Sequence, residues 1–431
     1  MNSAHRAVDP FSGIPTVVRR FLRCFEAAGY EAFLVGGAVR DALLQLPLHD
    51  WDIATSARPG DCAALFGDAV VSHVGVRFGT LGILYEQTYF EVTSYRAECA
   101  YDGRRPSQVL AVHTLEEDLA RRDFSINAIA WSEATGPVDP YGGQTDLQRR
   151  ILRTVGEPRR RFSEDALRML RAIRFAAVYA LEPVPELISA IRKLAPSVSH
   201  LSDERVFSEL DRMIQQESFL GAMNFLSKWE LWPILFPNAK EKAPPLSLSI
   251  AEGRVARWML LCEATEAWHL ARKDRSLCRS VQKLRELPKP DALPATQEDM
   301  RRLLGKAGID FLAYCDYLKA DVEGRKASVR TDAERTVAEA LSEQVSTFLF
   351  HAKAIKKRGL ALSRKDLAVT GTDLLQIGYN EGKDIGEVLA ELEKEVLSDR
   401  VENTKPALLE WAYRWKKKRG EESGNEAAHR E

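Results

Sequence analysis

Residues 34–55 read LVGGAVRDALLQLPLHDWDIAT, and this stretch decides the fold. Residues 33–35 are apolar and partly β-branched, which predicts a short buried strand. Gly36-Gly37 allow a tight turn in which backbone N–H groups can approach an anion. Residues 38–46 then predict a helix that ends before a proline, and Arg40 at its start adds a fork of donors. The stretch therefore predicts a strand, a phosphate-binding turn and a helix in succession.

Two aspartates one residue apart follow this helix, at positions 50 and 52. Alternate residues of a strand point to the same face, so Asp50 and Asp52 would present their carboxylates together. Two carboxylates about 6–7 Å apart on a strand can hold divalent metal ions, as nucleotidyl transfer requires. Alone, such a pair is more often a solvated strand edge. Its position about 15 residues after a phosphate-binding turn favours metal binding here.

The combination of turn and carboxylate pair resembles the nucleotidyltransferase superfamily to which DNA polymerase beta belongs. The spelling GGAVRD…DWDIAT is similar to its tRNA nucleotidyltransferase and bacterial poly(A) polymerase branch. This resemblance implies an α/β (α+β) nucleotidyltransferase head. It also implies two Mg²⁺ ions with Asp50 and Asp52 as ligands, and a triphosphate held by Gly37, Arg40 and Arg122.

A third carboxylate is predicted beside this pair. Residues 79–92 read GTLGILYEQTYFEV and predict a hairpin. Glu91 lies between two apolar residues of the second strand, so its side chain would point away from them and toward Asp50 and Asp52. On the pattern alone, an exposed strand glutamate is an equally good interpretation. The resemblance favours a catalytic carboxylate, because relatives often have an acidic residue at this position.

Two further segments complete the predicted head. Residues 95–114 are polar and include Arg104-Arg105, which predicts a mobile surface loop; the resemblance implies that this loop helps to switch nucleotide choice. Residues 116–130 read EEDLARRDFSINAIA and predict two short pieces with a charged break between them. A bare RRD is usually a solvated helix face. Here it nearly matches the family pattern RRDFTxNA, in which Arg122 binds the triphosphate, and Asn127 offers an amide near the site.

Residues 163–178 read SEDALRMLRAIRFAAV and predict one amphipathic helix. Ser163 is the expected N-cap, and acidic residues in the first turn suit the helix dipole. A polar ribbon follows, with residues three apart, each turned by about 60° from the last. Its members are Asp165, Arg168, Arg171 and Arg174. For an unknown helix, such a ribbon would be a solvated face with ion pairs.

This ribbon matches the family motif EDxxRxxRxxRF, which implies a nucleotide-reading role. A carboxylate accepts from the exocyclic amine of cytosine or adenine, and a guanidinium donates to the adjacent ring acceptor. Uracil and guanine present a carbonyl instead, which costs about 1–3 kcal/mol per unsatisfied group. We therefore expect Asp165 and Arg168 to select CTP and ATP without a nucleic-acid template. Arg171 and Arg174 would contact the triphosphate or support Arg168.

Strand patterns become rare after about residue 155, so the head is expected to precede an elongated all-α neck, body and tail. Residues 366–413 resemble the C-terminal module of the bacterial CCA-adding branch. The expected division is a head over 1–152, a nucleotide-selecting neck over 153–216, a body over 217–345, a tRNA-binding tail over 346–420 and disorder over 421–431.

Composition restricts the partners of this chain. Its 61 basic and 62 acidic side chains give a net charge of −1, so a polyanion would be held by local patches. The six cysteines lack CxxC or metal-ligand spacing, which argues against structural zinc and disulfides. Neither an apolar run of about 18 residues nor a signal peptide pattern occurs. We expect a cytoplasmic protein, a monomer or homodimer, with no membrane partner.

The full resemblance is to bacterial-type, class II CCA tRNA nucleotidyltransferases. It implies attack of a tRNA 3′-hydroxyl on the α-phosphate of CTP or ATP, with release of pyrophosphate. The nearest alternative is a poly(A) polymerase, or an enzyme that adds only CC or only A, because these have the same head motifs. A silent RNA-binding relative is disfavoured by the presence of all the motif residues. A small-molecule nucleotidyltransferase would not explain about 250 residues of helices after the head.

Overall fold

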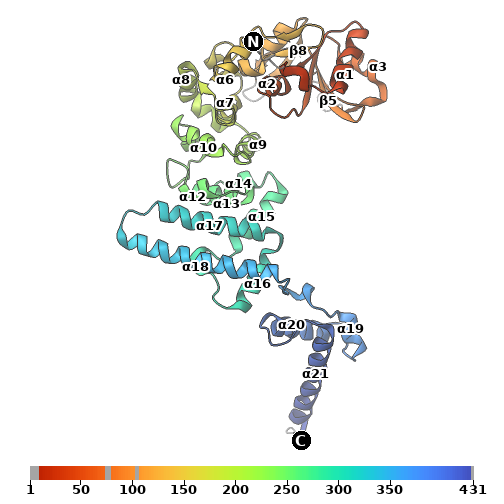
Figure 1. Cartoon of the computed structure of the whole chain (residues 1–431), viewed down its shortest axis with the longest axis vertical. Helices are drawn as coiled ribbons and strands as arrows, with labels where there is room; N and C mark the ends of the chain where they lie inside the picture. Colours follow the sequence, from red (N-terminus) through yellow and green to blue (C-terminus); the bar gives the residue numbers. More distant parts are fainter. Residues whose placement is uncertain (1–8, 73–78, 102–105, 429–431) are drawn as a thin grey trace, which may run out of the picture. The chain divides into compact units, whose positions relative to one another are not determined.

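The computed structural model describes residues 9–72, 79–101 and 106–428. The chain divides into two compact units, Met1–Pro244 and Pro245–Glu431. The first unit contains a mixed sheet followed by helices, and the described part of the second unit is helical (Figure 1). This confirms the predicted α/β head followed by an all-α region. The finer bounds of neck, body and tail stay predictions.

The described residues of the first unit form a seven-stranded sheet in the order β3-β4-β5-β2-β1-β8-β9. Adjacent strands are antiparallel, except that β2 and β5 are parallel. The predicted buried strand and the predicted hairpin are both present, as β1 and as β4 with β5. The strands are β1 (Ala32–Val35), β2 (Trp51–Thr55), β3 (Val70–Ser72), β4 (Thr80–Tyr85), β5 (Thr88–Ser94), β8 (Ala130–Ser132) and β9 (Gly136–Val138).

An aromatic cluster fixes helix α1 (Thr16–Ala27) against this sheet. The ring of Phe21 on α1 stacks on the ring of Phe90 on β5, with centroids 3.9 Å apart and planes 12° apart. Both side chains are fully buried. Phe90 immediately precedes Glu91, so this packing sets the position of a predicted site residue. The short helix α2 (Gly37–Leu43) follows the glycine turn as predicted.

The segment predicted as a mobile loop is instead a hairpin. Strands β6 (Arg96–Tyr101) and β7 (Pro106–Ala111) pair antiparallel. Strand pairing satisfies backbone N–H and C=O groups whatever the polarity of the side chains, so a polar composition does not exclude it. The predicted pair Arg104-Arg105 lies outside the described residues.

The helix predicted over 163–178 is two helices. Helix α6 (Pro158–Glu164) ends before Asp165, and α7 (Leu167–Val178) begins after it (Figure 1). Asp165 has φ −152° and ψ 108°, which is extended backbone. Its carboxylate accepts a hydrogen bond from the Leu167 N–H at 3.0 Å, so it satisfies a donor of the first turn of α7. Ser163 is therefore a residue inside α6 and caps no helix.

Three more helices of the first unit surround α7. They are α8 (Pro185–Leu194), α9 (Asp203–Ile214) and α10 (Phe219–Lys228). Helices α9 and α10 both contact α7. The two-residue strands β10 (Ile151–Leu152) and β11 (Glu182–Pro183) pair in parallel on either side of α6 and α7 in the sequence.

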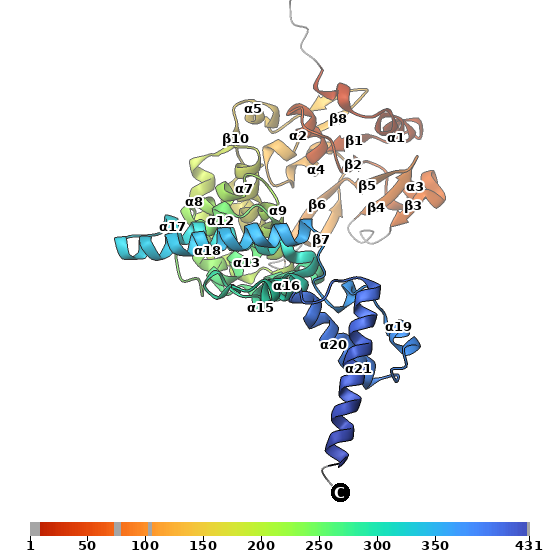
Figure 2. The same cartoon turned by 60° about the horizontal axis from the view of Figure 1, so that its bottom comes forward.

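The second unit consists of packed helices, of which α17 and α18 lie side by side (Figures 1 and 2). Among the described residues, no helix combines the length and hydrophobicity needed to cross a membrane. Its longer helices are α13 (Arg254–Thr265), α15 (Arg275–Glu286), α16 (Gln297–Ala307), α17 (Phe311–Ala327), α18 (Asp332–Lys357), α20 (Lys383–Leu397) and α21 (Lys405–Ala428).

The C-terminal helices contain a core of their own, formed by Leu374, Val388, Leu392, Leu408 and Ala412. Helix α21 continues to Ala428, where the sequence predicted disorder from residue 421. The segment after residue 420 is rich in Glu and Ala, which are strong helix formers and extend an existing helix easily.

Phe21→Ala should destabilise the first unit, because it removes a ring from the cluster that holds α1 on β5. We expect a loss of about 3–5 kcal/mol of unfolding free energy. Amide hydrogen exchange of residues 88–94 measures this locally. Val71→Ala, at a side chain that is 54% exposed, is the control and should change stability by less than about 0.5 kcal/mol. Equal effects of the two substitutions would contradict this packing.

Candidate active site

A pocket of about 640 Å³ in the first unit brings together ten of the eleven predicted site residues. Its lining includes seven arginines and five aspartates, so cationic groups exceed anionic ones. Glu91 is the predicted residue that does not line it. The predicted residues around it are Gly37, Arg40, Asp50, Asp52, Arg122, Asn127, Asp165, Arg168, Arg171 and Arg174. An excess of guanidinium groups suits a ligand that carries several negative charges.

The carboxylates come from two neighbouring parallel strands. Asp52 on β2 is the register partner of Glu91 on β5. Glu91 is exposed while Phe90 and Val92 on either side of it are buried, as predicted. Asp50 differs from the prediction, because β2 begins at Trp51 and Asp50 precedes it with φ +56°. Aspartate tolerates this left-handed conformation better than most residues.

The electrostatics of Asp52 fit a cation. Burial raises its pKa to about 6, and the nearby charges of Glu91 and Asp50 raise it further against the opposing effect of Arg122. A divalent cation beside these carboxylates would remove that repulsion. In the described part of the chain, no three acidic, histidine or cysteine side chains already form a metal site. Magnesium sites often use one or two carboxylates plus substrate phosphates, so Asp50 and Asp52 suffice as the protein's ligands.

The glycine turn brings Arg122 close to Asp52. Gly36 has φ +71°, and a Cβ atom there would lie 3.1 Å from Nη1 of Arg122 and 3.7 Å from Oδ2 of Asp52. A side chain would therefore be strained and crowded at this position. The sequence prediction singled out Gly37 for binding, whereas Gly36 carries the conformational requirement.

A chain of hydrogen bonds connects α2 to α7 through the segment after the RRD sequence. Arg40 donates from Nη1 to Oδ1 of Asn127 at 2.7 Å, and Asn127 donates to Oδ1 of Asp123 at 3.0 Å. Arg171 donates from Nε to Oδ2 of Asp123 at 2.7 Å. Burial opposes ionisation of Asp123, but Arg171 outweighs it and holds the pKa of Asp123 at about 2. Asp123 thus stays charged and fixes side chains from three elements.

Arg122 is held near Asp52 by only part of its guanidinium. Its Nη2 contacts Oδ2 of the buried Asp118 at 3.3 Å, and its Nη1 donates to the Asn127 carbonyl at 3.4 Å. Its Nε is buried without a hydrogen-bond partner among the described residues. Burial lowers the pKa of Arg122. Its guanidinium is therefore incompletely satisfied by the protein, which fits a residue that awaits an anion.

The two residues predicted to read the base are held by separate partners. Arg205 on α9 donates from Nη2 to Oδ2 of Asp165 at 2.7 Å. Arg168 is buried, and its Nη1 donates to Oε2 of Glu164 at 2.7 Å. Nη2 of Arg168 also donates to the carbonyl of Arg121 at 3.1 Å. Asp165 and Arg168 both line the pocket, on either side of the start of α7.

Glu209 on α9 organises the other two arginines of the ribbon. It is buried, and its carboxylate accepts from Nε of Arg174 at 2.8 Å and lies 3.6 Å from Nη1 of Arg171. The guanidinium groups of Arg171 and Arg174 also lie over the ring of Phe175, at 5.2 and 4.4 Å from its centroid. Cations near each other are tolerated here because an anion and an aromatic face separate them.

Sequence reasoning missed the supporting residues of the site. The segment around residues 201–216 was recognised as a helix, but the roles of Arg205 and Glu209 were not. They lie four residues apart, which places them on one face of α9. That spacing was the available signal, but it does not indicate which helix the face would contact.

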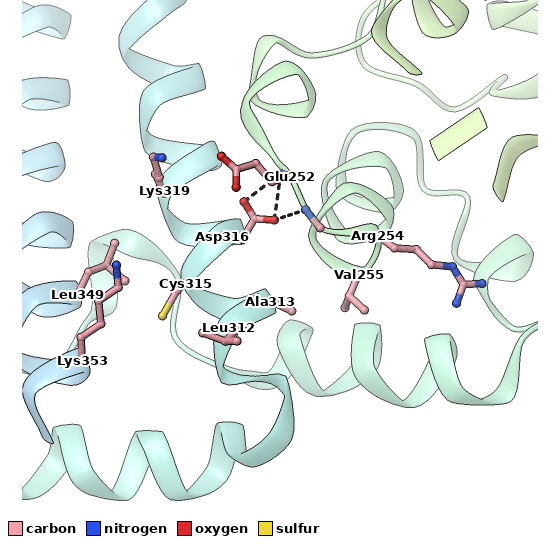
Figure 3. Close-up of a pocket in the computed structure, with 11 residues that line it drawn as sticks. Glu252, Arg254, Val255, Leu312, Ala313, Cys315, Asp316, Lys319, Leu349 and Lys353 are labelled. Atoms are coloured by element: carbon pink, nitrogen blue, oxygen red, sulfur yellow. Dashed lines mark hydrogen bonds between the residues drawn. The ribbon is translucent and has the colours of Figure 1, made fainter. Parts of the chain in front are cut away.

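A second pocket, of about 560 Å³, lies in the second unit between α13, α17 and α18 (Figure 3). Asp316 on α17 accepts hydrogen bonds from the N–H groups of Glu252, at 3.1 Å, and Gly253, at 2.6 Å. These contacts satisfy backbone donors just before α13, so they stabilise the start of that helix. None of the predicted site residues lies in this pocket.

Comparisons with known proteins agree with this geometry. Residues 32–153 match the family model "Poly A polymerase head domain". Residues 181–242 match an RNA and SrmB-binding site of polymerase A, and residues 328–412 match tRNA nucleotidyltransferase domain 2.

The similar proteins are CCA-adding enzymes. That of Geobacillus stearothermophilus is 34% identical over 89% of this chain and 93% of its own length. That of Geobacillus thermodenitrificans is 34% identical over 93% of this chain and 96% of its own length. The crystal structure of the Bacillus stearothermophilus CCA-adding enzyme in complex with CTP has a TM-score of 0.69 and 28% identity, covering 96% of this chain and 99% of that one.

This chain belongs to the family of CCA-adding enzymes. It is therefore a nucleotidyltransferase, as the opening motif predicted. Nucleotidyltransferases of this family typically use a divalent metal, and the carboxylates of Asp50 and Asp52 are suitable ligands for one. In this CCA-adding enzyme, the matched head contains Asp50, Asp52, Glu91 and Arg122, whereas the α6–α7 break lies between two matched segments.

Asp52→Asn should make the metal-free chain more stable at neutral pH. The pKa of Asp52 is about 6 in the folded chain and about 3.9 in an unfolded one. The folded state therefore binds the proton more tightly, and stability falls as the pH rises through this window. We expect Asp52→Asn to raise the unfolding free energy at pH 7.5 by on the order of 1 kcal/mol. This gain should shrink as the pH falls toward 4.

Thermal unfolding in EDTA measures this difference, with Asp68→Asn at an exposed position as the control. Magnesium should then raise the melting temperature of the native chain more than that of Asp52→Asn. A lower stability of Asp52→Asn at pH 7.5 without metal would contradict the electrostatic account of this site.

Proposed function

We propose that this chain adds CCA to the 3′ end of tRNA, with CTP and ATP as substrates and without a nucleic-acid template. The observation that carries the proposal is the single pocket that joins the carboxylates of the β2 strand to the residues around the α6–α7 break. Such a pocket can hold a triphosphate near the reacting carboxylates and contact its base at the same time. The name of the similar enzymes supports the product.

The proposed reaction is attack of the tRNA 3′-hydroxyl on the α-phosphate of the bound nucleotide, with pyrophosphate as the leaving group. Asp50 and Asp52, with Glu91 in register beside Asp52, would hold two Mg²⁺ ions. When bound, such ions lower the pKa of the attacking hydroxyl and neutralise charge on the leaving oxygens. Their negative charges otherwise repel one another, so these carboxylates favour a cation over an empty site.

The arginines of the pocket bind and orient the triphosphate in this proposal. Arg40 and Arg122, beside the turn at Gly37, would contact the phosphates, with Asn127 holding Arg40 in place. Arg171 and Arg174 reach the same pocket from α7. Guanidinium groups form two parallel hydrogen bonds with phosphate oxygens, which fixes orientation as well as charge.

The choice of nucleotide is assigned to Asp165 and Arg168. Asp165 accepts a hydrogen bond from the amine of cytosine or adenine, and Arg168 donates to the neighbouring ring atom. The carbonyl of uracil or guanine would face the carboxylate without a proton between them. The buried contacts of Arg168 with Glu164 limit its movement toward other partners, which supports a fixed hydrogen-bond pattern.

The nearest alternative is a poly(A) polymerase, or an enzyme that adds only CC or only A. The pocket itself suits all of these, because they read the same amines. The similarity to CCA-adding enzymes over nearly the whole chain favours CCA addition. We further propose that the helices of the second unit support tRNA, that the enzyme works as a monomer or homodimer, and that it acts in the cytoplasm, where its substrates are found.

Incubation with a tRNA that lacks its 3′ CCA tests the function directly. With CTP alone we expect two nucleotides to be added, and with CTP and ATP we expect three and then no more. Asp52→Ala should lower the rate by at least about 10³-fold, because it removes a proposed metal ligand, while tRNA binding stays within a fewfold of the native value. A long adenosine tail, or a stop after two cytidines when ATP is present, would contradict the proposal.

A further inference from the structure

We propose that Arg205 is a positioning residue that sets nucleotide choice through Asp165. Arg205 lies in the first turn of α9, and it does not line the pocket. Its only route to the nucleotide is therefore through a residue that does. This inference rests on the proposed function, and specifically on the reading of the base by Asp165.

The carboxylate of Asp165 is held at both oxygens. Oδ1 accepts from the backbone N–H of Leu167 at 3.0 Å, and Oδ2 accepts from Nη2 of Arg205 at 2.7 Å. The backbone of Asp165 is fixed as well, because its N–H donates to Arg161 and its carbonyl accepts from Arg168. A carboxylate has about four acceptor positions, so the positions that remain for a ligand have defined directions.

Removing Arg205 would release one of these two restraints. The terminal torsion of an aspartate has a broad preference, so the carboxylate plane would turn more freely about the bond that Leu167 alone restrains. A carboxylate that can turn away no longer faces the carbonyl of uracil or guanine. The penalty against those bases then decreases, while cytosine and adenine lose a well-directed acceptor. The expected effect is therefore on discrimination between nucleotides.

The second contact of α9 serves a different part of the nucleotide. Glu209, one helical turn after Arg205, contacts Arg174 and Arg171, which are assigned to the triphosphate. All four nucleotides have the same triphosphate. A change at Glu209 should therefore weaken binding of CTP and ATP alike, and the two positions on one helix face separate base choice from phosphate binding.

A purely structural role of Arg205 predicts something else. The Arg205 and Asp165 side chains are 20% and 19% exposed, and partly exposed ion pairs contribute little to stability. The fold should therefore tolerate loss of this pair. If the pair only fastened α9 to the α6–α7 break, its loss would lower the activity with all nucleotides by the same factor.

The experiment first establishes that the native full-length chain adds CCA to tRNA, so that failure of the proposed function is seen separately. It then measures kcat and KM for CTP, ATP, UTP and GTP in Arg205→Ala, Arg205→Lys and Glu209→Gln. Arg192→Ala is the matched control, because Arg192 on α8 forms an ion pair with Glu230 at 3.3 Å away from the pocket. Circular dichroism and the melting temperature report folding.

In Arg205→Ala we expect kcat/KM for UTP relative to CTP to rise at least about tenfold, the size of one lost hydrogen-bond discrimination. Arg205→Lys should restore part of the native ratio. Glu209→Gln should raise KM for CTP and ATP together with an unchanged ratio, and Arg192→Ala should match the native chain. If Arg205→Ala folds poorly, Arg205→Met keeps the apolar stem without the donors and takes its place. A folded Arg205 variant with native discrimination would overturn the inference.

Discussion

Two buried carboxylates, Asp123 and Glu209, hold the arginines on which the rest of the pocket depends. Asp123 binds Arg171 and, through Asn127, Arg40, and Glu209 binds Arg174. Guanidinium groups this close together would repel one another strongly in a pocket with little water. With the two acids between them, the arginines stay charged and fixed, and the pocket keeps the excess of positive charge that a triphosphate neutralises.

The site consists of two halves that are far apart in the sequence. The half on β2 and β5 supplies carboxylates next to a turn, which suits transfer of a nucleotide but does not indicate which nucleotide. The half around α6, α7 and α9 supplies a fixed acceptor and fixed donors, which suits recognition of a base edge. Because both halves line one pocket, a protein surface can take the place of a template strand.

The parts of the site that depend on local sequence were predictable. The strand before the glycine turn, the hairpin that contains Glu91 and the charged break after Arg122 each follow from residue order over a few positions. The break at Asp165 was missed because the residues around it favour a helix, and a side-chain bond to Leu167 decides the outcome. Arg205 and Glu209 were missed because their contacts depend on how α9 packs on α7, which no local pattern contains. The hairpin of β6 and β7 was missed because its pairing is a property of the backbone.

The central claim is that the protein alone reads the base, and equilibrium binding of nucleotides without tRNA tests it most directly. Asp52→Asn removes a proposed metal ligand and leaves the residues around the α6–α7 break unchanged, so binding can be measured without turnover. The account predicts that this variant binds CTP and ATP at least about tenfold more tightly than UTP and GTP. Equal affinity for all four nucleotides would contradict it.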